Sequence, residues 1–337
     1  MPIQNYPTVF DCTEMTAAVN KLPALPVYFR RLFEVKGVKT TTVSLDIRKG
    51  RIVLIGDSER NTAPESLAGR GAKREWMHLS CAHLAMSDTL APEDLQDVRA
   101  FGSTEPISVA EVYNDKMQQL KDNMTATMEF HRLGAIKGVV LDANGTTVLH
   151  DIFNTFGVTK KKMDISFPKT AADDANPILT SILNAKRHVE AAMGGTPFSH
   201  IECIIGSDAY DMLTSHKLVR EYFERWLSNR SNFGDNDYRK RGFPYGGLTF
   251  VERSDVVGGK TMVDAKKGHV YPVGPGIFKQ YHAPADWMET VNTMGVEEYA
   301  RRDLKEKGRG IDMEWQSNPR TLCTFPEALI ELNCKAA

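Results

Sequence analysis

Two strand-like segments separated by a long polar stretch constrain the fold of this chain more than any other feature. In residues 38–57, "VKTTTVSLDIRKGRIVLIGD", the apolar Val43, Leu45 and Ile47 alternate with polar neighbours, which predicts a strand. A polar, glycine-containing stretch at 58–75 follows, and "WMHLSCAHLAM" then returns to strand-like character. A connection of this length is unusual inside a compact domain unless it has a function of its own. We therefore expect an extended hairpin, with so little core that it gains stability only by lying on another chain.

Composition limits the classes of protein that this chain can belong to. Its 337 residues suggest two domains or one large body, and 42% hydrophobic with 25% charged residues is typical of a soluble globular protein. Forty-two basic residues nearly cancel 43 acidic ones, so no overall charge favours nucleic acid or a membrane surface. The start carries no secretory signal, no segment approaches the ~20 apolar residues of a membrane span, and the five cysteines are scattered. These features indicate a soluble protein made in a cytoplasm.

A long helix is expected from Ser108 to Lys137. Apolar residues recur there at helical spacing, namely Val109, Tyr113, Met117, Leu120, Met124 and Met128. Ser108 and Glu111 have the spacing of a capping box, in which each side chain accepts a hydrogen bond from the backbone of the other residue. The methionine stripe favours packing in a core or between subunits over a cofactor site.

Several shorter elements follow from turn and cap residues. The Asn-Gly dipeptide at 144–145 lies between two apolar runs and predicts a hairpin with a type I′ turn. A second helix is expected with Asn176 as its cap, Pro177 in its first turn and Gly194 at its end. After it, "IECII" reads as a buried strand, and Ser207 is the expected cap of the next helix.

Three sequence patterns resemble functional motifs only in part. "VVGGKT" at 256–261 lacks the first glycine of a phosphate-binding loop, where Ser254 stands, and no helix follows, so it favours a Gly-Gly turn. "GSDAY" lacks the glycine spacing of a nucleophile elbow. Strand alternation places His78 on the opposite face from Cys81 and His83, which argues against a zinc site.

The charged residues do not point to catalysis. No spacing singles out a catalytic pair among the acidic residues weighed, which are Asp173, Asp174, Asp208, Asp235 and Asp237. The basic runs at 160–162 and 239–241 favour solvated surface over phosphate contacts. We therefore expect no enzyme, no cofactor and no metal site.

The order of features along the whole chain resembles one protein family. A proline-flanked "YFRRLF" precedes the hairpin with its "GRGAKRE" tip, and "LAPEDLQDVRAFGS" leads into the long helix. An Asn-Gly hairpin and "GSDAY" follow, and "YHAPADWMETVNTMG" and "QSNPRTLCTFPEALIEL" come near the end. In this order the features resemble the lambda-type major capsid protein (protein E) family of tailed bacteriophages. None of them is a catalytic motif, so the resemblance rests on their common order.

The resemblance implies an α+β fold, the major capsid fold shared by tailed phages and herpesviruses. Its expected parts are an N-terminal arm at 1–37, an extended loop at 38–90, a peripheral domain with a long spine helix at 91–195, an axial domain at 196–290 and a return to the peripheral domain at 291–337. Within this return, residues 311–332 are expected to complete the peripheral sheet as a strand whose edges are set by Pro319 and Pro326.

The implied function is that of a major capsid protein, assembling as hexamers and pentamers into an icosahedral head that encloses double-stranded DNA. Assembly is expected in the host cytoplasm, and the product is the virion. The implied partners are further copies of the chain, a separate scaffold protein (because the chain begins close to the arm), a decoration protein and the portal. No sequence-specific DNA binding and no membrane are expected. A near-neutral charge suits a container whose DNA must be released.

Two other functions are weighed against this one. An encapsulin-like compartment has the same fold, but the lambda-type features recur from end to end. A cytosolic hydrolase would need a converging motif that the sequence lacks.

Contacts between subunits are expected in the arm, the extended loop and one basic run. The candidate residues are Phe29, Arg30, Phe33, Arg51, Arg60, Arg70, Lys73, Arg74, Arg239 and Arg241. For the arm, two alternatives remain open. Phe29, Leu32 and Phe33 either anchor an extended segment on another surface or belong to a short helix packed on its own domain.

Overall fold

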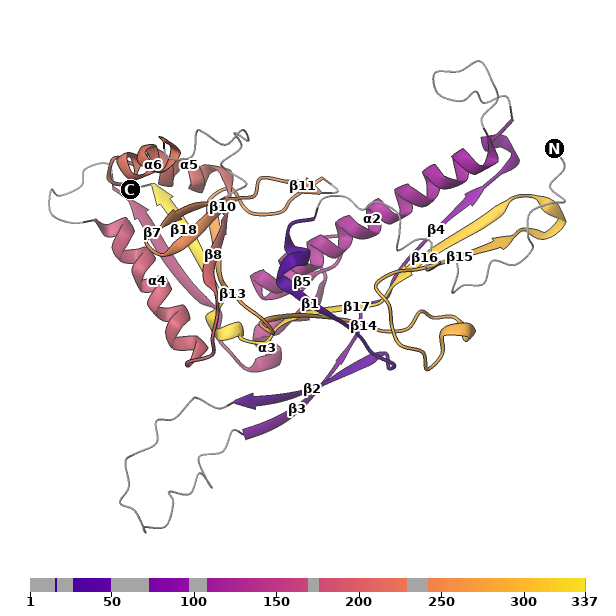
Figure 1. The fold of residues 1–337 in the computed structure, drawn as a ribbon, viewed down its shortest axis with the longest axis horizontal. Coiled ribbons are helices and arrows are strands. Elements are labelled where there is room, and N and C mark those ends of the chain that lie inside the picture. Colours follow the sequence, from indigo (N-terminus) through magenta and orange to yellow (C-terminus); the bar gives the residue numbers. More distant parts are fainter. Residues whose placement is uncertain are drawn as a thin grey trace, which may run out of the picture. The chain divides into compact units, whose positions relative to one another are not determined.

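The computed structural model describes residues 16, 27–49, 73–96, 108–168, 176–228, 242–257 and 259–336. The chain divides into two compact units that interleave along the sequence (Figure 1). Unit 1 is drawn from Met1–Leu45, His78–Glu129 and Lys279–Thr321, and unit 2 from Asp46–Met77, Phe130–Phe278 and Leu322–Ala337.

Unit 1 is built around a long helix packed on a sheet. Most of helix α2 (Val109–Lys137) lies in this unit, beside an antiparallel sheet of order β15-β16-β4 (Figure 1). The strands are β4 (Leu84–Leu90), β15 (Tyr299–Leu304) and β16 (Ile311–Ser317). The short 3-10 turns η3 (Pro92–Asp94) and η5 (Glu306–Gly308) lie before α2 and between β15 and β16.

The apolar stripe of α2 forms the core of this layer. Its buried cluster joins the helix to all three strands and consists of Leu90, Met117, Leu120, Met124, Met128, Ala300, Met313 and Trp315. Val109 and Tyr113 pack against the same cluster. The stripe is therefore core, as one of the two sequence interpretations held.

Two smaller sheets contain the segments before β4. The first has the order β1-β14-β17 and is formed by β1 (Phe33–Gly37), β14 (Phe278–His282) and β17 (Pro319–Cys323). The second pairs β2 (Thr42–Lys49) with β3 (Lys73–Ser80), as the sequence predicted for the extended hairpin (Figure 1). The second strand is shorter than expected, because β3 ends at Ser80 and the chain then enters β4 of a different sheet. The tip at 58–72 lies outside the described residues.

Unit 2 contains a mixed six-stranded sheet of order β7-β18-β13-β8-β10-β9. Its strands are β7 (Lys161–Phe167), β8 (His200–Ile205), β9 (Phe243–Tyr245), β10 (Leu248–Glu252), β13 (Lys267–Val273) and β18 (Ile330–Ala336). The central strand β8 pairs parallel with β10 and antiparallel with β13, and it is the buried "IECII" strand that the sequence predicted.

Helices and hairpins complete unit 2. Helix α4 (Pro177–Met193) buries one face, with Ile178, Ile182, Ala185, Val189 and Met193 at intervals of three or four. The other elements are β5 (Val139–Leu141), β6 (Val148–Asp151), α3 (Ile152–Phe156), α5 (Ser207–Ser215), α6 (Lys217–Ser228), β11 (Val256–Val257), β12 (Lys260–Thr261) and η6 (Pro326–Ala328).

The caps of the two long helices are confirmed. The Ser108 hydroxyl accepts a hydrogen bond from the Glu111 N–H (3.2 Å), and the Glu111 carboxylate accepts one from the Ser108 N–H (3.0 Å). Gly138 follows the last turn of α2 with a φ of 82°, where any Cβ would overlap the ring of Phe153. In α4 the Asn176 side chain accepts a hydrogen bond from Leu179 N–H (3.0 Å), and Gly194 ends the helix in the left-handed region.

The predicted cap at Ser207 is wrong, because Gly206 occupies the N-cap position and Ser207 is the first residue of α5. The Ala209 N–H at this helix start donates to the Ala265 carbonyl (2.8 Å), so it does not need a hydroxyl partner. A side chain at Gly206 would overlap the backbone at Asp264, and this close approach explains the glycine.

The Asn-Gly hairpin between β5 and β6 is confirmed, but its predicted type I′ turn is wrong. That turn needs positive φ at both central residues, and here only Gly145 has one (72°). The Gly145 N–H donates to the Asp142 carbonyl (2.7 Å), which places the turn one step earlier. The Asn144 side chain accepts hydrogen bonds from the backbone N–H groups of Thr146 and Thr147 (2.8 and 2.9 Å). This Asx-type arrangement accompanies the negative φ of Asn144.

The C-terminal segment is more divided than the expected single strand. Residues 311–336 form β16, β17 and β18, which belong to three different sheets. Pro319 is the first residue of β17 and Pro326 the first of η6, positions at which a missing N–H costs little. Pro319 therefore begins β17 and Pro326 follows its end, so the two prolines bracket this one strand and separate it from β16 and β18.

The cap and the stripe of α2 give a test of this packing. Ser108→Ala removes an exposed cap and should lower the free energy of unfolding by about 1 kcal/mol. Met124→Asp places an unpaired charge in the buried cluster and should cost several times more. Thermal denaturation of the purified subunit, followed by circular dichroism, measures both. A larger loss for Ser108→Ala would contradict the register of α2.

Candidate functional site

The predicted arm contacts lie in a short 3-10 turn, η2 (Phe29–Leu32), followed by β1. Phe29 and Phe33 are only 1% and 5% exposed within the chain itself, and Leu32 is buried as well. Of the two alternatives for this segment, the short helix packed on its own domain is the observed one. Arg30 is partly exposed, and its guanidinium forms an ion pair with Glu297.

A buried carboxylate of α2 anchors this turn. The Glu129 side chain accepts hydrogen bonds from the backbone N–H groups of Tyr28 (3.0 Å) and Phe29 (2.8 Å). A carboxylate at the start of a helical turn satisfies free N–H groups and opposes their partial positive charge. The Arg31 guanidinium lies 4.5 Å from the centroid of the Tyr28 ring. The sequence gives no local sign of this role of Glu129, because its partners lie about one hundred residues earlier in the chain.

The remaining predicted contact residues carry no structural description of their side chains. Arg51, Arg60, Arg70, Arg239 and Arg241 lie outside the described residues. Lys73 and Arg74 begin β3, and only their backbone is described. All seven stay predictions.

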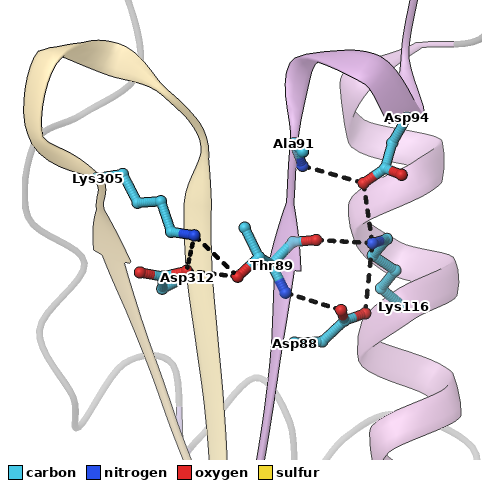
Figure 2. A network of polar contacts seen from close by, with 7 residues as sticks. All are labelled: Asp88, Thr89, Ala91, Asp94, Lys116, Lys305 and Asp312. Carbon is cyan, nitrogen blue, oxygen red and sulfur yellow. Dashed lines mark hydrogen bonds and ion pairs between the residues drawn. The ribbon is translucent and has the colours of Figure 1, made fainter.

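A polar network joins α2 to the strand beside it, at the end of the helix-on-sheet layer (Figure 2). The Lys116 ammonium donates to the Thr89 carbonyl (2.7 Å) and to the Asp94 carboxylate (2.9 Å), and the Asp88 carboxylate lies 3.4 Å away. The second function of Asp94 is to accept the Ala91 N–H (3.0 Å), which fixes the turn between β4 and η3.

Thr89 extends the network to the neighbouring strand β16 and to the turn after β15. Figure 2 shows this residue on β4 between Lys116 on one side and the β15–β16 hairpin on the other. Its hydroxyl donates to the Asp312 carboxylate (2.6 Å), and the Lys305 ammonium lies 3.2 Å from the same carboxylate oxygen. The network thus connects α2, β4, β16 and the turn that follows β15.

The network shifts the pKa values of its members in favour of their charged forms. Burial opposes the charge of Lys116, but the hydrogen bond to Asp94 and the nearby Asp88 outweigh it and raise the pKa of the ammonium. The Ala91 N–H and then Lys116 lower the pKa of Asp94. The Thr89 hydroxyl and then Lys305 lower the pKa of Asp312. These groups are paired ions that hold α2 and the neighbouring strands together.

The described cysteines lack the ionised sulfur that nucleophilic chemistry needs. Burial raises the pKa of Cys81, raises that of Cys203 well above its ordinary value, and raises those of Cys323 and Cys334 to about 12. A thiol with a raised pKa stays protonated at neutral pH and is a poor nucleophile.

One partly buried amine has an unusual pKa. Burial, and then the charge of Lys160, lower the pKa of Lys137 to about 8. Its ammonium donates a hydrogen bond to the Met262 carbonyl. This contact connects the end of α2 to the segment after β12, and it is a structural role that the sequence did not indicate.

The partial motifs have structural explanations. Lys260 of "VVGGKT" lies in β12, which pairs with β11, and its ammonium donates to the Ala143 carbonyl. His78 bonds the Ser44 hydroxyl (2.9 Å), whereas His83 bonds the Asn318 side chain (2.8 Å). Across the described ranges, no three His, Cys, Asp or Glu side chains gather as a metal-binding group. No helix in the described part of the chain combines the length and apolar character needed to cross a membrane.

Comparison with known proteins identifies the class. The chain matches the family "Phage major capsid protein E" over residues 11–334. The "Major capsid protein" of Pseudomonas phage KPP10 is 24% identical and covers 98% of both chains. That of Salmonella phage Felix O1 is also 24% identical, over 97% of both. The crystal structure of the putative capsid protein of an E. coli CFT073 prophage has a TM-score of 0.57, with 12% identity over 97% of this chain and 99% of that one.

The fold is therefore that of the major capsid proteins of tailed phages, as the sequence predicted. The chain belongs to the phage major capsid protein E family. Its function is that of a major capsid protein of a tailed phage, which forms the icosahedral shell, and it is part of the virion.

The network around Lys116 predicts a dependence of stability on pH. The pKa of Asp94 is lowered in the folded state, so its ionised carboxylate adds to the free energy of unfolding. This stabilisation is complete above the ordinary carboxyl pKa of 3.8 and is lost as the pH falls through the lowered pKa of the folded state. Asp94→Asn should thus destabilise the subunit more at pH 7 than at pH 3. Urea unfolding at both pH values measures the difference. Asp115→Asn, on the exposed face of α2, is the control, and an equal response of the two variants would contradict the role of the network.

Proposed function

We propose that copies of this chain assemble as hexamers and pentamers into an icosahedral head that encloses double-stranded DNA. The observation that carries this proposal is the match to phage major capsid proteins along nearly the full length of both chains. The balance of 42 basic and 43 acidic residues supports a wall that does not hold its DNA tightly. No sequence-specific binding of DNA is part of the proposal.

The two compact units suggest how the chain is divided within the shell. We assign unit 1, with α2 as the spine, to the peripheral domain and unit 2, with its six-stranded sheet, to the axial domain. The expected boundary between residues 195 and 196 falls between α4 and β8, which belong to one compact unit. We therefore propose that the axial domain also includes β7 and α4. The paired strands β2 and β3 are the base of the proposed extended loop, which lies over a neighbouring subunit.

The proposed partners are further copies of the chain, a scaffold protein during assembly, the portal and a decoration protein. Assembly takes place in the host cytoplasm, and the role is structural, without a catalytic step. Paired ions and protonated thiols support this structural role. The proposed contact residues are Arg30, Arg51, Arg60, Arg70, Lys73, Arg74, Arg239 and Arg241. Phe29 and Phe33 would support such contacts from beneath, because both are buried in their own chain.

Electron microscopy of the expressed protein, alone and together with a candidate scaffold protein from the same phage genome, tests the proposed function. Closed icosahedral shells of uniform size support it. Soluble subunits that never assemble with any phage partner would contradict it. Shells that form without a scaffold and capture a cargo peptide on the inner face would favour an encapsulin-like compartment.

A variant of the extended loop tests the contact between subunits. Residues 58–72 combine glycines, Pro64 and many charges, a composition with too little apolar surface to fold alone. Replacing them with a two-residue Asn-Gly turn should leave the circular dichroism of the subunit nearly unchanged, because the two cores lie elsewhere. Shell formation should stop at capsomers or give fragile, aberrant heads. Normal shells with normal heat resistance, seen by microscopy and sedimentation, would contradict a role of this loop in contacts between subunits.

A further inference from the structure

One loop of unit 1 exposes an unusual group of apolar side chains. We call residues 285–298, between β14 and β15, the Met288 loop; it contains the short 3-10 turn η4 (Met288–Thr290). Met288 is 90% exposed, and Val291, Met294 and Val296 are 57%, 56% and 38% exposed. Single exposed apolar residues are ordinary on protein surfaces, but several in one short loop form a patch, and such patches mark interaction sites.

Hydrogen bonds hold the conformation of the Met288 loop. The Thr290 hydroxyl donates towards the Ala285 carbonyl (2.7 Å) and lies 2.9 Å from the Trp287 carbonyl. At the other end of the loop, the Val296 N–H donates to the Tyr299 hydroxyl (3.1 Å). The loop is thus shaped before any partner arrives, and a preshaped surface loses less conformational entropy on binding.

The underside of the loop is packed on unit 1. The rings of Trp287 and Tyr299 are buried and meet edge to face, with centroids 6.1 Å apart. The Gly295 N–H donates to the Val38 carbonyl (2.9 Å), and no side chain fits at Gly295 because it would overlap the carbonyl of His282. The loop therefore cannot turn its exposed methionines inward without breaking these contacts.

Two acidic residues of the loop pair with arginines of the same chain. Glu297 pairs with Arg30, and Glu289 lies 3.9 Å from Arg301. An apolar centre with a polar rim is the usual arrangement of an interface between proteins. The loop itself contains four acidic residues and no basic one, and the neighbouring Arg30 and Arg301 are both paired with carboxylates, so its own charge does not attract DNA or an anionic membrane.

We propose that the Met288 loop is a contact surface that packs against a second copy of this chain in the shell. The inference rests on the proposed function, because a shell subunit must bury surface against its neighbours. It specifies one of the surfaces that become buried. A second copy is favoured as the occupant because the chain belongs to a family of shell-forming proteins and because the patch has an apolar centre, a paired rim and a fixed shape.

Methionine oxidation followed by mass spectrometry tests the proposal on the unaltered protein. Dilute hydrogen peroxide converts exposed methionine to its sulfoxide and passes into a shell as easily as around it. In the free subunit Met288 should oxidise quickly, whereas buried Met124 should oxidise slowly. In assembled shells the rate at Met288 should fall about tenfold, with Met294 following it, and Met124 should stay slow. An unchanged rate at Met288 in shells would overturn the proposal.

A pair of variants tests whether the contact matters for assembly. Met288→Asp combined with Met294→Asp should leave the melting temperature of the free subunit unchanged, because both side chains are exposed, and should lower the yield of closed shells about tenfold or more. Met288→Leu combined with Met294→Leu keeps the apolar surface and should assemble normally.

The possible outcomes distinguish a failure of the proposed function from a failure of the proposed contact at the Met288 loop. A wild-type protein that forms no shells with its scaffold would overturn the proposed function and this inference with it. Wild-type shells accompanied by normal shells of the aspartate variant would overturn the inference alone. A melting temperature lowered by the aspartates would also overturn it, because the methionines would then be covered by their own chain.

Discussion

The packing of the methionine and leucine stripe of α2 on the β15-β16-β4 sheet is the interaction on which unit 1 depends. The sheet brings together strands that are more than two hundred residues apart in the chain, since Thr89 of β4 pairs across from Asp312 of β16. Backbone pairing alone cannot select this arrangement, because either face of such a sheet could turn to water. Burial of side chains such as Met124 and Trp315, each worth about 1.5–3 kcal/mol, decides which face meets the helix.

Two polar contacts at separate places along α2 then fix the helix against sliding. Lys116 fastens its first half to β4, and Glu129 holds the η2 turn further along. Thirteen residues of helix correspond to about 20 Å, so the two contacts define both position and rotation of the apolar stripe. Apolar packing tolerates small shifts, whereas hydrogen bonds at fixed distances do not, and buried carboxylates are costly unless they find these donors.

The features that sequence analysis predicted correctly are set by neighbouring residues. The capping box at Ser108, the cap at Asn176 and the Asn-Gly hairpin depend on residues a few positions apart, and the stripe of α2 is a periodic pattern. The features it missed depend on distant partners. Ser207 has the chemistry of a cap, but the Ala265 carbonyl takes its place, and nothing near Glu129 in the sequence reveals the backbone of Tyr28. The division of the C-terminal segment among three sheets also depends on strands elsewhere, and only the prolines indicated where it breaks.

A shell subunit has to be stable and soluble by itself, and it also has to expose surface for contacts with its neighbours. Different residues meet these two requirements. Charged groups such as Lys116 and Arg30 are paired within the chain, which stabilises the single subunit without leaving these groups to attract oppositely charged molecules. Apolar surface that is left outside carries a risk of aggregation, which grows if the segment can extend and pair as a strand. In the Met288 loop, Thr290 and Gly295 hold the backbone in turns, so its apolar side chains are presented while its backbone is kept from strand pairing. A restrained backbone combined with exposed side chains therefore favours specific side-chain contacts over non-specific strand pairing.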